Sequence, residues 1–216
     1  MVKYRGIIFD LDGVICSTDE YHYLAWKALA DRIGAEGFGR GDNARQRGVS
    51  RMESLEVVLE KAPRAYSAEE KLALAEWKNR KYRELLRNMS PGDLTPEVKA
   101  TLEALRKMGL ELAIGSSSKN APFILERIGL GNWFDAVADG NHISRSKPDP
   151  EVFLLAAETL GLKPQDCLVV EDAFSGIDAG IAGGFDTAAI GDAARYDKPT
   201  YKLGTFSDLL KIMEAG

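Results

Sequence analysis

Cysteine and histidine are scarce in this 216-residue sequence, which holds only two of each. Two cysteines as far apart as Cys16 and Cys167 give no disulfide framework and no metal-binding spacing. We therefore expect buried free thiols in a protein of the reducing cytoplasm. Basic residues are also in the minority, 28 against 33 acidic ones, for a net charge of −5. This balance argues against nucleic acid as a partner, whereas a phosphorylated small molecule needs only a few cations in one pocket.

Long hydrophobic runs are absent as well. Lys3 and Arg5 precede an apolar run in the manner of a signal peptide, but Asp10 and Asp12 cut that run short. No stretch approaches the length of a membrane span, so we expect no membrane partner. A hydrophobic fraction of 45% and a charged fraction of 28% are those of an ordinary soluble globular protein. The length suits one core with an inserted subdomain.

Strands and helices alternate through most of the chain. Short apolar runs predict strands, the first of them ending in a loop, over residues 7–13, 110–116, 136–138, 167–171 and 187–190. Between them, helical patterns that are each followed by a glycine span residues 97–108, 121–128 and 150–160. Near-continuous apolar strands that alternate with helices indicate an α/β fold, a Rossmann-like doubly wound parallel sheet. In such sheets the chemistry gathers at the carboxyl ends of the strands.

Residues 18–89 break this alternation. Three segments are helical by pattern, with no convincing strand between them: 20–33, 52–61 and 68–87. We therefore predict an all-helical cap domain over residues 18–89. It is inserted into a core domain made of residues 1–17 and 90–216. The glycine-rich stretch 34–41 is expected to be a loop inside the cap.

Two acidic pairs stand at predicted strand ends. Asp10 and Asp12 follow the first strand, and Glu171-Asp172 closes another. If these strands are neighbours, up to four acidic groups converge, and their repulsion demands a shared cation. Carboxylates gathered for phosphate chemistry suggest Mg²⁺. Phosphoryl transfer needs mainly in-line placement and charge neutralisation, so Asp10 can act as the nucleophile and Asp12 as general acid and base.

Ser116 and Lys147 also lie at or just beyond strand ends, and they could neutralise the side of the phosphoryl group that the metal does not reach. Each feature has an ordinary alternative. An Asp-x-Asp pair is common in turns, Glu171-Asp172 could cap the following helix, and Lys147 could be a surface lysine. Their shared placement at strand ends favours one active site over several unrelated features.

In this order the residues resemble the motifs of the haloacid dehalogenase superfamily of phosphohydrolases and phosphomutases. The matching motifs are Asp10-Leu11-Asp12-Gly13, Ser116, Lys147-Pro148 and Glu171-Asp172. The resemblance covers nearly the whole chain, including the inserted cap, and it implies an aspartyl-phosphate on Asp10, acid–base catalysis by Asp12 and a Mg²⁺ cofactor. The implied metal ligands are Asp10, Asp12 (through its backbone carbonyl), Glu171 and Asp172. The residues implied to bind the transferring phosphate are Ser116, Ser117 and Lys147.

Within the superfamily, the cap resembles that of the β-phosphoglucomutase subfamily. The shared features are His22 on the first cap helix, a Gly-Val-Ser-Arg turn at 48–51 and a Ser-Lys-Asn run at 118–120. A mutase must hold a second phosphate of a sugar bisphosphate far from Asp10, and Arg51 can bind that phosphate through two donors. The residues implied to bind the substrate and its distal phosphate are Thr18, His22, Gly48, Val49, Arg51, Ser54, Lys78, Ser118, Lys119 and Asn120.

The cap residues also have ordinary alternatives. A lone helical histidine such as His22 is usually at the surface or a satisfied core group, and Trp26 is typical of core packing. Arg51 and Lys78, each judged alone, would face solvent. His142 has no supporting neighbours in the sequence and is expected in a loop.

Three functions follow as hypotheses. The first is a β-phosphoglucomutase that interconverts β-D-glucose 1-phosphate and glucose 6-phosphate through a sugar bisphosphate. The second is a magnesium-dependent sugar-phosphate phosphatase, and the third is a catalytically silent binding protein. A distal phosphate site favours the mutase, because a phosphatase does not need one. A nucleophile with its acid–base partner argues against a silent protein. We expect a monomer whose partner is a small sugar phosphate.

Overall fold

The computed structural model describes residues 3–46 and 49–214. By its contacts the chain divides into two compact units, called here the core unit (1–17 and 90–216) and the cap unit (18–89). That each unit behaves as a separate domain remains a prediction. None of the helices in the described residues combines the length and the apolar character of a membrane span.

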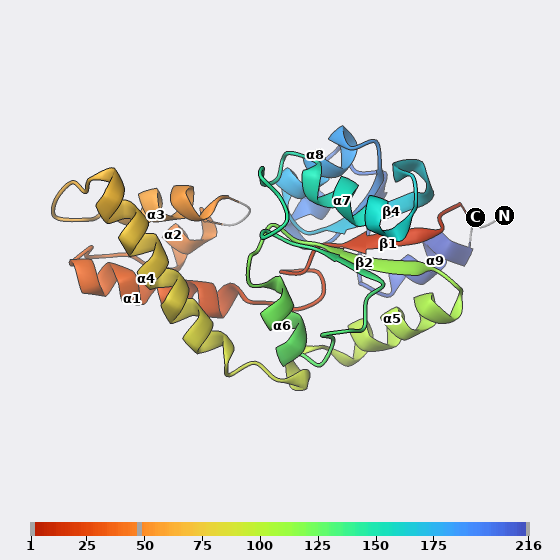
Figure 1. Cartoon of the computed structure of the whole chain (residues 1–216), viewed down its shortest axis with the longest axis horizontal. Helices are drawn as coiled ribbons and strands as arrows, with labels where there is room; N and C mark the ends of the chain where they lie inside the picture. The colour runs from red at the N-terminus through yellow and green to blue at the C-terminus, as the bar shows by residue number, and fades with distance from the viewer. Residues whose placement is uncertain (1–2, 47–48, 215–216) are drawn as a thin grey trace. The chain divides into compact units, whose positions relative to one another are not determined.

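A six-stranded parallel sheet forms the centre of the core unit (Figure 1). The strands lie in the order β3-β2-β1-β4-β5-β6 and span Gly6–Phe9 (β1), Glu111–Gly115 (β2), Ala136–Ala138 (β3), Cys167–Glu171 (β4), Asp186–Ala189 (β5) and Tyr201–Lys202 (β6). The predicted doubly wound α/β fold is thereby confirmed. Phe9 of β1 pairs with Ile114 of β2 and with Val170 of β4. The segments that leave these three strands therefore meet at one edge of the sheet.

Helices cover both faces of this sheet. The α-helices of the core unit are α5 (Pro96–Lys107), α6 (Ala121–Arg127), α7 (Glu151–Leu160), α8 (Phe174–Ala182) and α9 (Asp208–Glu214), and the 3₁₀ turns are η1 (Pro91–Asp93), η2 (Pro164–Asp166) and η3 (Gly191–Arg195). Figure 1 shows α7 and α8 on one face and α5 and α9 on the other. The apolar cores of the strands are buried between these layers, and both free cysteines, Cys16 and Cys167, are buried as expected. Strand β6 and helix α9 were not predicted.

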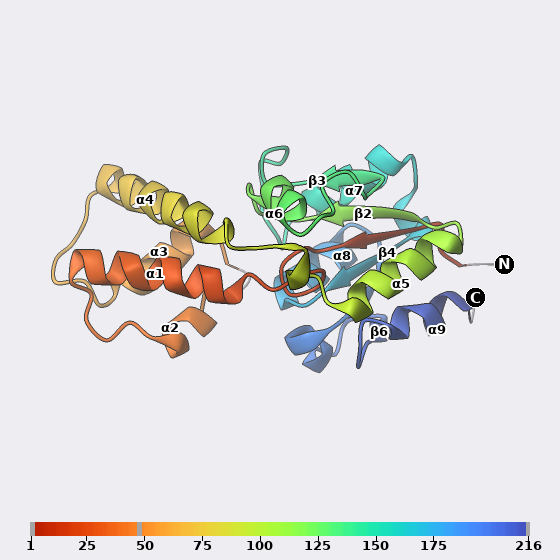
Figure 2. The ribbon, with the colours of Figure 1, turned by 90° about the horizontal axis from the view of Figure 1, so that it is seen from below.

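The described residues of the cap unit contain helices and no strand, as predicted. The helices are α1 (Asp19–Ile33), α2 (Arg40–Ala44), α3 (Arg51–Leu59) and α4 (Ala68–Leu86). Helices α1 and α4 pack side by side (Figures 1 and 2). Trp26, Leu29 and Leu55 are buried in the core of the unit, so Trp26 is a packing residue. The expected loop 34–41 is shorter than predicted, because helix α2 begins at Arg40.

Candidate active site

Asp10 and Lys147 form the centre of the site in the core unit. Asp10 directly follows β1, and Lys147 comes from the long segment between β3 and α7. The Nζ atom of Lys147 lies 2.5 Å from Asp10 Oδ1 and 2.5 Å from Glu171 Oε1, and only 8% of this lysine side chain is exposed. Lys147 is therefore a buried partner of two carboxylates, and the interpretation as a surface lysine is wrong.

Burial and charge shift the pKa values of this pair. Burial raises the pKa of Asp10 well above its ordinary value, against the opposing attraction of Lys147. Burial lowers the pKa of Lys147, but the charges of Asp10 and Glu171 outweigh it and raise that pKa above its ordinary value. Lys147 is thus a permanent ammonium beside the predicted nucleophile, where it can neutralise negative charge on a bound phosphoryl group.

Asp10, Glu171 and Asp172 bring one carboxylate oxygen each to within 4.8 Å of one another. All three donors are hard oxygen atoms, which is the donor type that Mg²⁺ prefers. Three carboxylates and the Lys147 ammonium leave a net charge of −2, which one divalent cation would balance. The donor set and its charge therefore fit the predicted magnesium ion.

Glu171 has a second contact besides Lys147. Its Oε2 atom accepts hydrogen bonds from the backbone N–H groups of Asp172 and Ala173, each at 2.9 Å, immediately before α8. Both N–H groups precede Phe174, the first residue of α8, so this oxygen orders the turn before the helix and does not cap the helix itself. The other oxygen faces Lys147 and the acidic cluster, so Glu171 links the start of α8 to the site.

The turn after β1 packs tightly against Asp172. Gly13 has a φ of 83°, and a Cβ atom there would lie 2.1 Å from Asp172 Oδ2. Only glycine suits both the left-handed backbone and this close approach. Asp12 stands in the same turn and is partly exposed, and its carboxylate is not one of the three clustered acids of the described chain. The role of the Asp12 carboxylate in proton transfer stays a prediction.

The loop after β2 is ordered by its own serines. Ser116 is buried, its N–H donates to Ala138 of the neighbouring strand at 3.0 Å, and its Oγ accepts from Ser118 N–H at 3.2 Å. Ser118 Oγ accepts in turn from the N–H of Asn120, which is buried, whereas Lys119 is exposed. The predicted phosphate-binding run thus starts at the same sheet edge as Asp10.

In the cap unit, His22 and Lys78 form a pair. Lys78 is 3% exposed, its Nζ lies 2.9 Å from His22 Nδ1, and it stands over the rings of Trp26 and Tyr82. An ammonium can only donate, so Nδ1 accepts and the ring proton of His22 sits on Nε2. Lys78 is buried, so the alternative expectation that it faces solvent is wrong. Tyr82 was missed, although its spacing of four from Lys78 places both on one helix face.

The remaining predicted cap residues are spread around α3 and the start of α1. Arg51 is exposed at the first position of α3, with Nη2 3.2 Å from Asn79 Oδ1. Ser54 and Thr18 are buried, and Val49 is 42% exposed. Gly48 lies outside the described residues. Arg51 is therefore accessible to a ligand, whereas Ser54 and Thr18 are buried in the structure.

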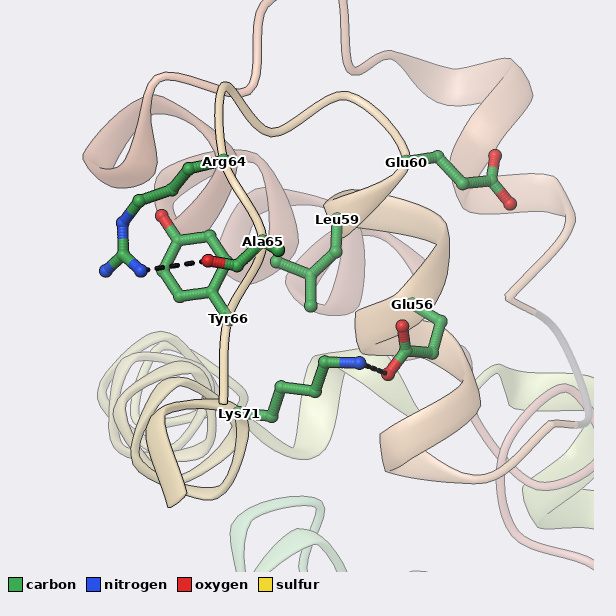
Figure 3. A pocket seen from close by; sticks show the side chains of 7 residues that line it. All are labelled: Glu56, Leu59, Glu60, Arg64, Ala65, Tyr66 and Lys71. Atoms are coloured by element: carbon green, nitrogen blue, oxygen red, sulfur yellow. Dashed lines mark hydrogen bonds and ion pairs between the residues drawn. The ribbon is translucent and has the colours of Figure 1, made fainter. Parts of the chain in front are cut away.

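A surface hollow of about 330 Å³ lies elsewhere in the cap unit (Figure 3). Its lining is Glu56, Leu59, Glu60, Arg64, Ala65, Tyr66 and Lys71. None of these belongs to the predicted site residues. Glu56 and Lys71 pair at 2.7 Å, and Arg64 pairs with Glu70 at 2.7 Å, so these charges neutralise one another. The hollow offers no convergent unbalanced charge for a phosphate.

The core unit is thus an α/β sheet that carries clustered carboxylates and a lysine at its carboxyl edge. A family model described as haloacid dehalogenase-like hydrolase matches residues 4–184. The chain belongs to this family, as its motif order predicted. It is an enzyme of the phosphoglucomutase or phosphatase kind.

Relatives of both kinds are similar over most of the chain. The β-phosphoglucomutase of Bacillus subtilis is 41% identical over 189 residues, 87% of this chain and 83% of that protein. The fructose-1-phosphate phosphatase YqaB of Escherichia coli is 32% identical over 87% of this chain and 97% of that protein. A crystal structure of β-phosphoglucomutase from Clostridium difficile superposes with a TM-score of 0.87, at 32% identity and over 98% of each chain. The resemblance to the β-phosphoglucomutase subfamily is thereby confirmed.

Proposed function

We propose that this enzyme is a β-phosphoglucomutase, which interconverts β-D-glucose 1-phosphate and glucose 6-phosphate through an aspartyl-phosphate and a sugar bisphosphate. The observation that carries this proposal is a second set of cations, Arg51 and Lys78, in a unit of the chain other than that of Asp10. The 41% identity with the Bacillus subtilis mutase supports it.

Asp10 and Asp12 would share the chemical step. The aspartyl-phosphate on Asp10 would first phosphorylate the sugar monophosphate: the free sugar hydroxyl attacks the phosphorus, the bond from phosphorus to Asp10 breaks, and Asp12 accepts the hydroxyl proton. The product is the sugar bisphosphate. After the bisphosphate turns over, a carboxylate oxygen of Asp10 attacks the phosphorus of the other phosphate, the bond from phosphorus to the sugar oxygen breaks, and Asp12 donates the proton that the leaving oxygen takes up.

Lys147 and Ser116 would hold the phosphoryl group during this transfer. The ammonium of Lys147 already lies within hydrogen-bond distance of Asp10, so it can bind an oxygen of a phosphoryl group carried there. Mg²⁺ held by Asp10, Glu171, Asp172 and the Asp12 carbonyl would neutralise charge on the transferring group. In both cases the protein supplies charge where the transition state develops it.

The cap cations would hold the second phosphate. Arg51 presents an accessible guanidinium that can form two hydrogen bonds to a phosphate. Lys78 is a buried cation fixed by two aromatic rings and a neutral histidine, and a buried cation is strongly attracted to an anion. Ser118, Lys119 and Asn120 would add donors from the core unit. A bisphosphate needs both groups of cations, whereas hydrolysis of a monophosphate needs only one.

The second candidate is a magnesium-dependent sugar-phosphate phosphatase. The similarity to the Escherichia coli fructose-1-phosphate phosphatase favours it, since that relative shares almost the same span of the chain. The chemistry would differ in one respect: water instead of a sugar hydroxyl would attack the phosphorus on Asp10. The cytoplasmic location and monomeric state expected from the sequence belong to either proposal and stay predictions.

A coupled assay separates these candidates. The enzyme is given β-glucose 1-phosphate, Mg²⁺ and a trace of glucose 1,6-bisphosphate, and glucose 6-phosphate and orthophosphate are followed in the same tube. Fast formation of glucose 6-phosphate with little orthophosphate is the expected result. Orthophosphate without isomerisation would replace the mutase by the phosphatase, and no turnover of any phosphate ester would contradict both.

A further inference from the structure

Asp139 is a buried carboxylate that neither the motifs nor the proposed chemistry uses. It directly follows β3, its side chain is 1% exposed, and it lies at the same sheet edge as the active site. Its Oδ1 atom accepts from the N–H of Asn141 at 2.7 Å and lies 2.9 Å from Nδ1 of His142. His142, expected to be an isolated loop residue, therefore has a partner.

Burial of this carboxylate lowers the free energy of unfolding. Its second oxygen, Oδ2, is buried and has no hydrogen-bond partner among the residues that the structure describes. A buried carboxyl group with an unsatisfied oxygen makes the folded state less stable. Such groups are rare in native proteins and call for an explanation. A functional role is one such explanation, because proteins tolerate local cost at their sites.

The residues that follow Asp139 are joined to the phosphate-binding loop. The Nδ2 atom of Asn141 donates to the carbonyl of Lys119 at 3.1 Å, and the N–H of Gly140 lies 3.3 Å from the carbonyl of Ser118. A Cβ atom on Gly140 would lie 2.3 Å from the carbonyl oxygen of Ser117. The turn that Asp139 holds therefore packs backbone to backbone against residues 116–120.

The same segment continues to Lys147. The N–H of Lys147 is 3.5 Å from Ser117 Oγ, a long contact that cannot by itself hold the segment in place. Two further anchors hold the segment: the turn at Asp139 at its start, and Glu151 of α7, which accepts from the N–H groups of Ser144 and Arg145 at 2.9 and 2.8 Å. The turn at Asp139 is the one that joins the segment to the phosphate-binding loop, so it contributes to the position of the Lys147 ammonium relative to that loop.

We propose that Asp139 is a positioning residue, which holds segment 140–147 against segment 116–120 and so keeps Lys147 and Ser116 in a common geometry around the phosphoryl group. This inference rests on the proposed phosphoryl transfer at Asp10. It holds equally for a mutase and for a phosphatase, because both need the same aspartyl-phosphate.

The test compares Asp139→Asn with Asp135→Asn. Asp135 stands at the opposite end of β3 and likewise accepts a backbone N–H, that of Leu112 at 2.8 Å, and pairs with Arg106 at 3.1 Å. The readouts are the rate of phosphoenzyme formation from acetyl phosphate, kcat and KM for the sugar phosphate, and urea stability. We expect Asp139→Asn to lower the rate of phosphoenzyme formation and kcat about 10- to 100-fold, with little change in KM. Small misplacements of catalytic groups have effects of this size.

A double-mutant cycle with Lys147→Ala distinguishes positioning from a general structural role. If Asp139 acts through Lys147, the loss caused by Asp139→Asn shrinks to less than about threefold in the Lys147→Ala background. An equally large loss in both backgrounds would overturn the proposal, and so would a wild-type rate for Asp139→Asn. A rate loss for Asp135→Asn as large as that for Asp139→Asn at matched stability would also overturn it.

Asn141→Ala keeps the test open if Asp139→Asn fails to fold. This exposed residue can be changed without touching the buried carboxylate, and the variant loses the bond to Lys119. A several-fold slower phosphoenzyme formation is expected, and an unchanged rate would count against the coupling of the two segments. Failure of the wild type to take up phosphate from acetyl phosphate would instead contradict the proposed function itself.

Discussion

At the scale of single residues, the surroundings of Lys147 and Lys78 decide what these lysines can do. Lys147 is held between two carboxylates, whereas Lys78 lies over two aromatic rings beside a neutral histidine. The first is neutralised by those carboxylates, and the second is a buried cation in aromatic surroundings. Both are buried, so neither behaves as the flexible surface lysine that composition alone suggests.

Asp10→Asn should abolish turnover. An amide cannot form the acyl phosphate, so the reaction loses its covalent step while the fold keeps a residue of the same size. We expect the rate to fall by at least about four orders of magnitude, or ~5.5 kcal/mol in activation free energy. Intact mass after incubation with acetyl phosphate should show a phosphorylated wild type and an unmodified variant. Substantial turnover by the variant would contradict the mechanism.

His22 should stay neutral well below pH 6.5. Burial lowers its pKa well below the ordinary value, and the charges of Lys78 and Arg51 lower it further. The unfolded chain takes up this proton first, so the stability present above pH ~6.5 is lost as the pH falls toward the folded pKa.

NMR titration of the His22 ring checks this directly. Urea unfolding of the wild type and of His22→Gln at pH 7.5 and 5.5 should show the larger loss of stability in the wild type. An ordinary titration midpoint near pH 6.5 would mean that the buried pair does not form in solution.

At the scale of elements, helix starts are set by side chains that the sequence makes recognisable. Helix α4 begins after Ser67, whose Oγ accepts from Glu70 N–H at 3.2 Å while Glu70 Oε2 accepts from Ser67 N–H at 2.8 Å. This reciprocal capping box satisfies two of the free N–H groups at the helix start. The same arrangement at Ser50 and Glu53 starts α3, directly before Arg51.

Ser67→Ala should therefore lower the stability of the enzyme without touching the proposed chemistry. The loss of the cap should cost ~1 kcal/mol in free energy of unfolding, measured by urea denaturation. The rate of phosphoenzyme formation on Asp10 should stay at the wild-type value under conditions where both proteins are folded. Ser67→Asp is the matched control, since aspartate also caps a helix and should preserve stability. A loss below about 0.3 kcal/mol would show that the cap contributes little here.

At the scale of the whole molecule, the division of labour between the two units carries the functional proposal. The proposed nucleophile Asp10, Lys147 and the clustered carboxylates belong to the core unit, and Arg51 and Lys78 belong to the cap unit. By the proposed chemistry, hydrolysis of a small ester draws on the first set alone, whereas the mutase reaction draws on both. We therefore expect mutation to separate the two reactions.

Arg51→Ala should lower mutase turnover far more than hydrolysis of a small ester such as p-nitrophenyl phosphate. A lost charge-assisted bidentate contact is worth about 1.5–3 kcal/mol, which corresponds to a ~10- to 150-fold loss of mutase kcat/KM. Ester hydrolysis should change less than about twofold. Arg80→Ala, on an exposed part of α4, serves as the control and should affect neither reaction. An equal fall of both activities in Arg51→Ala would contradict the distal-phosphate role.

Most strands and helices of this protein could be predicted because each follows from a pattern within a short stretch of the sequence. Apolar runs followed by Asp10, Ser116 and Glu171 predict parallel strands with polar ends, and parallel strands bring those ends to one edge. The helical character of residues 18–89 is likewise a local pattern. Strand β6 has only two residues, which is too short to show a period in the sequence.

The sequence by itself determined the fold class, the family and the residues that meet at the sheet edge, since these depend on periodicity and on the order of motifs along the chain. Only the tertiary structure decided which groups bind which. The contact of Lys147 with both Asp10 and Glu171, the close approach of Gly13 to Asp172 and the hydrogen bond of Asn141 to Lys119 join residues far apart in sequence. Such contacts depend on strand order and packing, and no local pattern records them.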